Sequence, residues 1–423
     1  AYGLMINAGA KMTQMENRIV LARFKDGYGP VGAYFLHLKT YTQNGFGEEY
    51  ESKWFPSLQK MVGKEYLDPE LSHRTHRPIP TCLRNHAIIS EVNAGRGPIH
   101  MVTMHAFQDP HLEEVGWENF LGMTVGQAVL WAATDVDPKN ENPELTTSEP
   151  YVMGSHATGA GGWASGPEDV SPPEYFWGYN RMMTIEGLFG AGDAVGGTPH
   201  AFSSGSFTEG RLAAKAACQY IDDGKAEGIK INNEQITNRE AEIFQPLERY
   251  KIYRNEIVAG TVSPSYIHPK QGLDRLQKLM DEYCGGVTVS YMTNEKLLNI
   301  GLKKLKVMEE DLECLAAKDL HELLRSWELK HRHRTAECVT QHTLFRKETR
   351  WPGYYYRGDA MKLDDENWHV LTVSRRDPQT GKYTLEKAPC YHLVGEEEET
   401  ATQAPPKTKK TAQANKTATA SGN

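Results

Sequence analysis

One stretch limits the possible fold more than any other part of the chain. Residues 186–217 read as a strand, a glycine-rich turn and a helix. The apolar run 185–191 predicts a buried strand, and the glycines within 192–197 predict a turn where the backbone bends sharply or approaches another group closely. From Ser206 the spacing becomes helical, and the first turn of such a helix favours an anion or an electron-rich ring edge. An ordinary strand-to-helix crossover remains the alternative.

Composition narrows the class of protein. A chain of 423 residues predicts two or three domains, and a net charge of −8 argues against a general nucleic-acid-binding surface. No run of about 18 apolar residues is present, so we expect no membrane span, and the N-terminus shows no signal-peptide pattern.

The cysteines and histidines do not predict a metal site. The six cysteines are scattered without a CxxC pair, which argues against an iron–sulfur cluster or a structural zinc held by this chain. A reduced, cytoplasmic protein is the expected context. The histidine pairs lack helix-face spacing and a nearby third ligand, so we expect solvated or core histidines.

Changes in composition divide the chain into five segments. Residues 1–18 predict a helix end and a loop, and 19–150 predict a mixed α/β unit. The elements expected in that unit are strands at 32–38 and 100–107, helices at 56–62 and 125–133, and a linker at 135–150. Residues 151–231 carry the glycine-rich stretch.

The segment 232–394 is expected to be helical at first and rich in aromatic residues later. The expected helices are 233–255, 272–283, 295–315 and 318–334, the last ending in His-Arg-His-Arg. The turn at 377–381 predicts a β-hairpin, and the aromatic density of 335–394 fits either an interface or internal packing. Residues 395–423 contain lysines, threonines and prolines without aromatics and predict a disordered tail.

Two further stretches have the composition of ligand-binding loops. In 23–36, Arg23 has a fork of donors that suits sulfate, phosphate or carboxylate, and Tyr34-Phe35-Leu36 can form an apolar wall. The alternative is a surface loop entering a strand. In 151–162, His156 lies in a run too glycine-rich for ordinary core and can act as acid, base or hydrogen-bond donor. The alternative is a turn with an exposed histidine.

These motifs carry a family resemblance. The run Gly-Leu-Phe-Gly-Ala-Gly-Asp-Ala, followed by Ser-x-x-x-Gly-Arg-x-Ala-Ala, resembles the C-terminal FAD-binding segment of the succinate dehydrogenase/fumarate reductase flavoproteins. The longer runs 22–33 and 192–207 resemble the α (flavoprotein) subunits of dissimilatory adenylylsulfate reductases within that family. The resemblance extends from residue 1 to about residue 394.

Two departures from the wider family favour the narrower group. The Arg-Gly-Glu-Gly loop of succinate dehydrogenases and fumarate reductases is absent from the sequence. Their His-Tyr-x-Met-Gly-Gly motif is replaced by Pro-Tyr-Val-Met-Gly-Ser at 150–155, with the histidine moved to position 156. A site for a dicarboxylate such as succinate or fumarate would therefore lack both of these motifs.

The resemblance implies a fold class and an incomplete cofactor domain. We expect a partial α/β FAD-binding domain with an inserted α+β capping domain and a C-terminal helical domain. The implied bounds are 1–18 and 151–231 for the FAD-binding parts, 19–150 for the capping domain and 232–394 for the helical domain. No GxGxxG motif that would hold the pyrophosphate is found, so we expect an N-terminally truncated piece of a larger flavoprotein that binds FAD poorly alone.

The resemblance also implies an activity and its residues. Adenylylsulfate would be reduced to AMP and sulfite, reversibly, through attack of the reduced FAD N5 atom on sulfur. Arg23 and His156 match the catalytic anion-binding pair, and Phe35 and Leu36 match the adenine sandwich. The implied cofactor-binding residues are Gly192, Asp193, Ser204, Gly205, Ser206 and Phe207. Asp193 would contact the ribityl or ribose hydroxyls, and 204–207 would bring backbone N–H groups to the N1/O2 edge of the ring.

The family obtains its electrons from an iron–sulfur β subunit with two [4Fe–4S] clusters, and this chain has no cluster ligands of its own. The aromatic region 335–394 and the basic residues 331–334 are candidate contacts with that subunit. Two alternatives stay open. The chain is another fumarate reductase or succinate dehydrogenase type flavoprotein, or it is a non-catalytic fragment.

Overall fold

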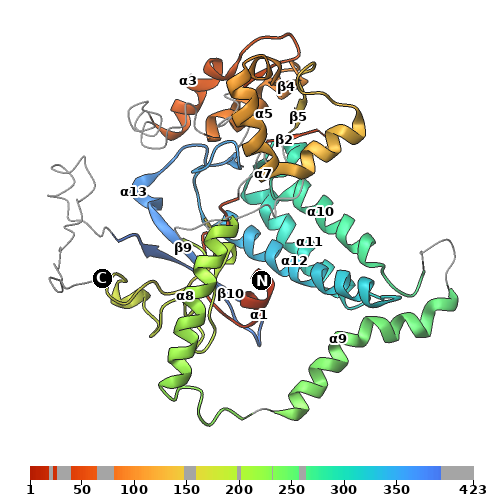
Figure 1. Cartoon of the computed structure of the whole chain (residues 1–423). Helices are drawn as coiled ribbons and strands as arrows, with labels where there is room; N and C mark the ends of the chain where they lie inside the picture. Colours follow the sequence, from red (N-terminus) through yellow and green to blue (C-terminus); the bar gives the residue numbers. More distant parts are fainter. Residues whose placement is uncertain are drawn as a thin grey trace, which may run out of the picture. The chain divides into compact units, whose positions relative to one another are not determined.

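A computed structural model describes residues 1–18, 22–25, 40–63, 81–146, 159–197, 202–230, 232–256 and 263–391 (Figure 1). The chain divides into two compact units, Ala1–Pro389 and Cys390–Asn423. The structure describes the first two residues of the second unit, so the predicted disordered tail at 395–423 lies outside the described residues. All elements below belong to the first unit.

A four-stranded antiparallel sheet joins distant parts of the chain in the order β10-β9-β1-β6. Its strands are β1 (Met12–Thr13), β6 (Gly161–Gly162), β9 (Val370–Arg376) and β10 (Tyr383–Pro389). The predicted hairpin is therefore confirmed as β9 and β10. The expectation of a simple loop after the first helix, α1 (Tyr2–Asn7), is wrong, because β1 follows it and lies inside the sheet.

A second antiparallel sheet lies in the 19–150 region, in the order β2-β5-β4-β3. The strands are β2 (Arg23–Phe24), β3 (Tyr41–Gln43), β4 (Ile99–Val102) and β5 (Glu144–Thr146). The accompanying helices are α3 (Glu51–Val62), α5 (Thr81–Asn93), α6 (Met104–Phe107) and α7 (Pro110–Thr134). Side chains of both kinds of element form one apolar core around Phe24, Met101, Trp131 and Leu145.

Two predictions in this region are wrong, and one is untested. The expected strand 100–107 ends at Val102, because the Thr103 N–H donates to the side-chain oxygen of Asn142 at 3.0 Å and α6 begins. The expected linker 135–150 contains β5, an interior strand whose Leu145 is buried. The expected strand 32–38 lies outside the described residues.

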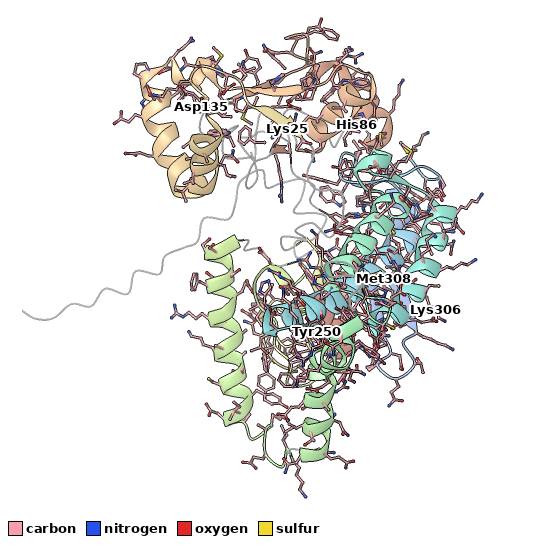
Figure 2. The ribbon with its side chains drawn as sticks, turned by 90° about the vertical axis from the view of Figure 1, so that its right-hand side faces the viewer. Lys25, His86, Asp135, Tyr250, Lys306 and Met308 are labelled. Atoms are coloured by element: carbon pink, nitrogen blue, oxygen red, sulfur yellow. The ribbon has the colours of Figure 1, made fainter. Side chains whose placement is uncertain are left out.

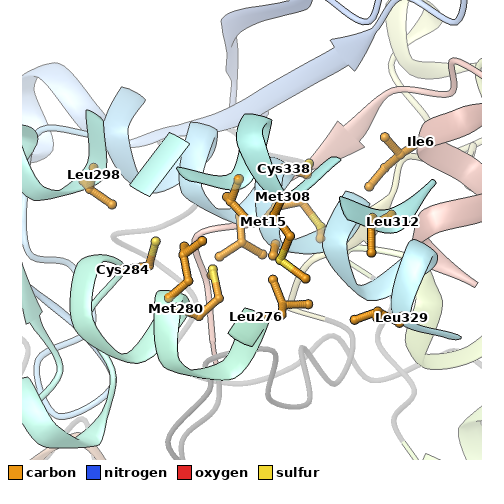
Figure 3. Close-up of a cluster of buried hydrophobic side chains, with 14 of the residues drawn as sticks. Ile6, Met15, Leu276, Met280, Cys284, Leu298, Met308, Leu312, Leu329 and Cys338 are labelled. Atoms are coloured by element: carbon orange, nitrogen blue, oxygen red, sulfur yellow. The ribbon is translucent and has the colours of Figure 1, made fainter. Parts of the chain in front are cut away.

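The helical part is formed by four helices, three of which surround the largest apolar core. They are α9 (Asn233–Tyr253), α10 (Pro269–Tyr283), α11 (Glu295–Leu312) and α12 (Leu320–Phe345). Each begins after a residue whose side chain accepts a hydrogen bond from the first turn: Asn232, His268, Asn294 and Asp319. Leucines and methionines of α10, α11 and α12 interleave with Ile6 and Met15 from the N-terminal segment (Figure 3).

The predicted end of the last helix is wrong. α12 continues past residues 331–334 to Phe345, so the His-Arg-His-Arg sequence lies in mid-helix and has no role at a helix terminus. His333 is buried with its Nε2 atom 2.8 Å from the Leu305 carbonyl oxygen. The Arg334 guanidinium donates to the carboxylates of Glu309 and Glu337. The charge of Arg334 is thus paired within the chain.

The aromatic region packs largely within the chain. Tyr354, Tyr355, Tyr356 and Trp368 are buried, whereas Trp351 is 42% exposed. Tyr356 begins β8 (Tyr356–Arg357), which pairs in parallel with β7 (Met292–Thr293). Its hydroxyl lies 2.8 Å from Nδ1 of His86. His86 belongs to α5 and is labelled in Figure 2. Internal packing therefore accounts for most of the aromatic density that also fitted an interface.

A buried polar network fixes the segment after β1. The Glu16 carboxylate accepts hydrogen bonds from the Arg346 guanidinium at 2.5 Å and from the Thr372 hydroxyl at 2.7 Å. Nδ1 of His342 lies 3.1 Å from the same carboxylate. All four side chains are essentially excluded from solvent. The network joins the N-terminal segment to α12 and β9.

Candidate functional site

The glycine-rich turn is a short 3₁₀ helix, η4 (Gly192–Ala194). Gly192 has φ +69°, and a Cβ atom there would lie 2.9 Å from the Ser206 Oγ atom. The backbone angle therefore favours glycine here, and the following helix approaches this position closely. The strand predicted at 185–191 is wrong. Gly187, at φ +77°, closes a turn there, and Phe189 makes an isolated β-bridge with Met182.

The turn lies against the second glycine-rich stretch. Gly162 and Val195 form a parallel β-bridge. A Cβ atom on Gly161 would lie 2.2 Å from the Ala194 carbonyl oxygen, closer than real Cβ contacts come. These glycines of 159–162 thus permit the two backbones to touch. They support the shape of the turn.

The following helix, α8 (Phe202–Asp222), starts four residues before the predicted position. Its first backbone N–H groups have no partner within the helix, and they point outward into the space before its N-terminal end. Ser203, Ser206 and Phe207, together with Asp193 of the turn, border an open pocket of about 560 Å³. Phe207 is 82% exposed although its side chain is apolar. Polar groups and an apolar ring therefore meet in front of the helix.

The N-terminal helix α1 holds the backbone of Asp193 in place. The Tyr2 hydroxyl donates a hydrogen bond to the Asp193 carbonyl oxygen at 2.9 Å. Burial, and secondarily the nearby Asp193 carboxylate, raises the pKa of Tyr2 to about 12. The hydroxyl therefore stays protonated and remains a donor at any working pH.

The predicted cofactor residues lie together in this region, with different surroundings. Gly192 and Gly205 are buried, Asp193 is partly buried, and Ser204, Ser206 and Phe207 are exposed. Ser203 and Tyr2 are further contributors that sequence reasoning missed. Ser203 shares the Ser-Ser-Gly-Ser run and was within reach of prediction, whereas no local signal connects Tyr2 to residue 193.

Arg23 lies in a strand. It begins β2 and pairs with Thr146 of β5, so its prediction as part of a loop is wrong for this residue. Its side chain is partly buried. Phe35, Leu36 and His156 lie outside the described residues. Thr146, the strand partner of Arg23, is the last described residue before the segment 147–158 that contains His156.

That segment connects the two halves of the candidate site along the chain. It leaves from β5 beside Arg23, and the described chain resumes at Gly159, two residues before β6 and its contact with the turn. Among the described residues, no group of three or more His, Cys, Asp or Glu side chains has the arrangement of a metal site. No helix in the described ranges is long and apolar enough to cross a bilayer.

The first comparison with known proteins concerns the protein family. Residues 273–411 match the model of the fumarate reductase flavoprotein C-terminal region. This match makes the C-terminal part of the chain similar to that flavoprotein family, and the similarity indicates a flavin cofactor.

A higher similarity is found to one group of these flavoproteins, the adenylylsulfate reductases. Over 413 residues the chain is 42% identical to the adenylylsulfate reductase α subunit of Megalodesulfovibrio gigas, an alignment covering 93% of this chain and 60% of that protein. The adenylylsulfate reductase structure from Archaeoglobus fulgidus matches with a TM-score of 0.83 and 46% identity over 93% of this chain and 62% of that one. A structure described as adenosine-5-phosphosulfate reductase in complex with sulfite, as a covalent adduct, matches equally well.

The resemblance to adenylylsulfate reductase α subunits, drawn from residues 22–33 and 192–207, is therefore confirmed. The predicted fold class, a partial flavoprotein α/β domain with a capping domain and a C-terminal helical domain, is confirmed by the same structural matches and the family match. The chain spans about three fifths of the length of the relatives that it matches.

Proposed function

We propose that this chain is part of a flavoprotein that reduces adenylylsulfate to AMP and sulfite, in a reversible reaction. The observation that supports this most is the likeness to adenylylsulfate reductases, which covers 93% of the chain. The reaction joins a dianionic substrate to an electron donor, so its site needs fixed cations and dipoles.

The proposed cofactor is FAD, which supplies the electron pair when bound. The pocket in front of α8 suits the edge of a flavin ring, because an acidic group, hydroxyls and an apolar ring border it. We assign the cofactor contacts to Gly192, Asp193 and residues 204–207. Gly192 supports the fit through its φ of +69° and its close approach to Ser206, which bring the backbone of the turn next to the start of α8. The helix N-terminus stabilises negative charge on a ring edge in front of it.

The proposed substrate contacts come from the other half of the site. Arg23 and His156 would bind the sulfate and phosphate oxygens, and Phe35 and Leu36 would enclose the adenine. Arg23 supports this role through its place in β2, since a strand holds its backbone more firmly than a loop would. The planar guanidinium can bind two oxygens of one anion at once.

The proposed partner is an iron–sulfur β subunit with two [4Fe–4S] clusters, which would deliver the electrons. Within the described part of the 335–394 region, exposed Trp351 is a better candidate contact than the buried tyrosines. We also propose a cytoplasmic location. Five cysteines of the described residues are free thiols, as expected in a reducing compartment.

The test uses the full-length protein with its iron–sulfur partner. We expect AMP- and sulfite-dependent reduction of an artificial electron acceptor, and no succinate-dependent reduction of the same acceptor. Activity with succinate in place of AMP and sulfite would favour a fumarate reductase or succinate dehydrogenase type enzyme and overturn the proposal. A full-length protein that binds no flavin would favour a non-catalytic role.

A further inference from the structure

Arg181 holds together the loop that supports the glycine-rich turn. Its backbone has φ +63°, a conformation that residues other than glycine seldom adopt. Its N–H donates to the Ser165 carbonyl oxygen at 2.9 Å, and its carbonyl oxygen accepts from the Gly190 N–H at 3.0 Å. Gly190 is two residues before η4. The unusual backbone angle is therefore maintained by contacts directly below the turn.

The side chain of Arg181 connects this loop to α8. Its guanidinium donates to the Glu209 carboxylate through Nε, and through Nη2 at 3.1 Å, so the two groups meet as a fork. The remaining nitrogen, Nη1, donates to the Ser165 carbonyl oxygen at 3.2 Å. The Glu209 side chain is fully buried, and that of Arg181 is 9% exposed.

Glu209 anchors the half of α8 that borders the pocket. The neighbouring helix residues on its N-terminal side are mostly exposed: Ser203, Ser204, Ser206, Phe207 and Thr208. The other half of α8 is held separately by Tyr220, whose ring contacts Tyr179 and Phe189. The Tyr220 hydroxyl also donates to Glu186 at 3.5 Å. The two halves of the helix thus have distinct attachments.

We propose that Arg181 and Glu209 are positioning residues, whose ion pair sets the N-terminal turns of α8 against the Asp193 turn. A buried ion pair seldom stabilises a fold more than a well-packed apolar pair does. A two-pronged Arg–carboxylate contact does add geometric specificity, because both hydrogen bonds need one relative orientation of the two groups. A helix rotated by one residue would carry Glu209 out of the fork and move Ser203, Ser206 and Phe207 with it. Because helix-end electrostatics fall off within one turn, a small displacement would weaken them at the pocket.

This inference rests on the proposed flavin site, and its test separates the two. The full-length flavoprotein is titrated with sulfite, and the dissociation constant is read from the loss of visible flavin absorbance. The double variant Arg181→Met with Glu209→Leu replaces the ion pair with apolar side chains. We expect it to keep the wild-type unfolding midpoint within a few degrees and to bind sulfite at least tenfold more weakly.

Two further variants complete the design. Glu209→Asp keeps the charge but shortens the side chain, and should weaken sulfite binding severalfold without changing the unfolding midpoint. Glu186→Gln alters the attachment at the other half of α8 and should leave the sulfite constant within twofold of the wild-type value.

The possible results distinguish failure of the positioning role from failure of the proposed function. Wild-type sulfite constants in both the double variant and Glu209→Asp would overturn the positioning role while leaving the proposed function intact. Weakening that merely follows a loss of thermal stability in all three variants would also overturn the positioning role. A wild-type protein whose flavin does not respond to sulfite would overturn the proposed function, and the inference with it.

Discussion

The Gly196 N–H donates a hydrogen bond to the Gly162 carbonyl oxygen at 3.1 Å, which joins the two glycine-rich stretches backbone to backbone. Gly162 belongs to β6, so the turn before α8 is attached to the sheet that contains β1 and β9. The candidate site therefore takes its shape from a glycine-to-glycine contact. A Cβ atom on Gly196 would lie 2.9 Å from the Gly161 nitrogen and would separate the two stretches.

Gly161→Ala should destabilise the protein. The added Cβ would meet the Ala194 carbonyl oxygen at 2.2 Å, and the backbone would have to shift. Overpacking of this kind costs about 1–3 kcal/mol, measured as the free energy of unfolding by denaturant titration. The full-length variant should also retain less flavin after gel filtration, because the displaced turn carries Asp193.

Gly210→Ala is the matched control for this prediction. Gly210 lies within α8, and a Cβ atom there meets nothing within 4 Å. Alanine in a helix should stabilise it by about 0.5–1 kcal/mol. Equal effects of the two substitutions would contradict the close approach described for Gly161.

Glu16→Gln should lower the free energy of unfolding by about 1.5–3 kcal/mol, because it removes one of the two buried carboxylates, Glu16 and Glu348, that pair with the Arg346 guanidinium. Glu386→Gln is the control. Glu386 pairs with Lys11 at an exposed position, and such surface pairs contribute about 0–1 kcal/mol. Urea titration of both variants measures the difference.

The same network predicts a pH dependence. Burial acts to raise the pKa of Glu16, but Arg346 and His342 outweigh it and lower that pKa from 4.5 to about 2. A depressed carboxyl pKa stabilises the fold above its unfolded value, and the gain is lost as the pH falls from about 4.5 to 2. The contribution amounts to about 3 kcal/mol. Acid unfolding of Glu16→Gln should lack this component, and an unchanged acid transition would contradict it.

Two neighbouring tyrosines should respond in opposite ways to loss of their hydroxyls. The Ser57 hydroxyl donates to the Trp54 carbonyl oxygen, so at 2.7 Å it accepts from Nε2–H of His86. Nδ1 of His86 is then the acceptor for the Tyr356 hydroxyl at 2.8 Å. Tyr356→Phe leaves the imidazole nitrogen buried without a donor and should cost about 1–3 kcal/mol. The Tyr355 hydroxyl is buried without a hydrogen-bond partner among the described residues. Tyr355→Phe should therefore be neutral or stabilising, and thermal unfolding of both variants checks the contrast.

The Tyr356 contact should also weaken in acid. Burial lowers the pKa of His86 below 6.5, so the folded protein keeps the imidazole neutral. The stability that this group contributes is present above about pH 6.5 and is lost as the pH falls through the lowered value. Hydrogen exchange of α5 should increase over that window in the wild-type protein. It should respond less in His86→Gln, and identical responses would contradict the assignment.

Arg23→Ala in the full-length enzyme should lower turnover with AMP and sulfite by a factor on the order of 10²–10³, the usual effect of removing one preorganised charge donor. Lys25→Ala is the control from the same segment, because Lys25 is exposed and pairs with Glu144 at 2.8 Å (Figure 2). Steady-state kinetics of both variants decide the matter. A comparable loss in Lys25→Ala would point to general electrostatics instead of a specific contact.

Local signals predicted the helices better than the sheets. Asn232, Asn294 and Asp319 mark helix starts within a few residues of those observed, because a capping side chain acts on its own first turn. The strands β1 and β5 have only two and three residues, which is too short for an alternating pattern to be visible in the sequence. Both also pair with segments far away in the sequence. The end of α12 was misread because charged residues there are accommodated by partners on α11 and α12 itself.

The part of the candidate site that lies within one short stretch of sequence could be predicted. The contacts that bring distant segments together could not. Asp193, Ser206 and Phe207 border one pocket, as expected for residues on a turn and the following helix. The contribution of Tyr2 depends on a contact across most of the chain, and the Arg181–Glu209 pair depends on a loop whose path no motif specifies. Such contacts follow from tertiary packing, and the sequence alone does not reveal them.

The central position of β1 has a consequence for how the chain folds. Met12 pairs with Gly162 on one side and with Ser374 on the other, so this sheet has very high contact order. Sheets closed by such distant partners form slowly, because loop closure precedes any gain from pairing. During synthesis one edge of β1 stays unpaired until β6 has been made, and the other stays unpaired until β9 is made near the end of the described chain. The helices can form early, but the surface that supports the glycine-rich turn is completed last.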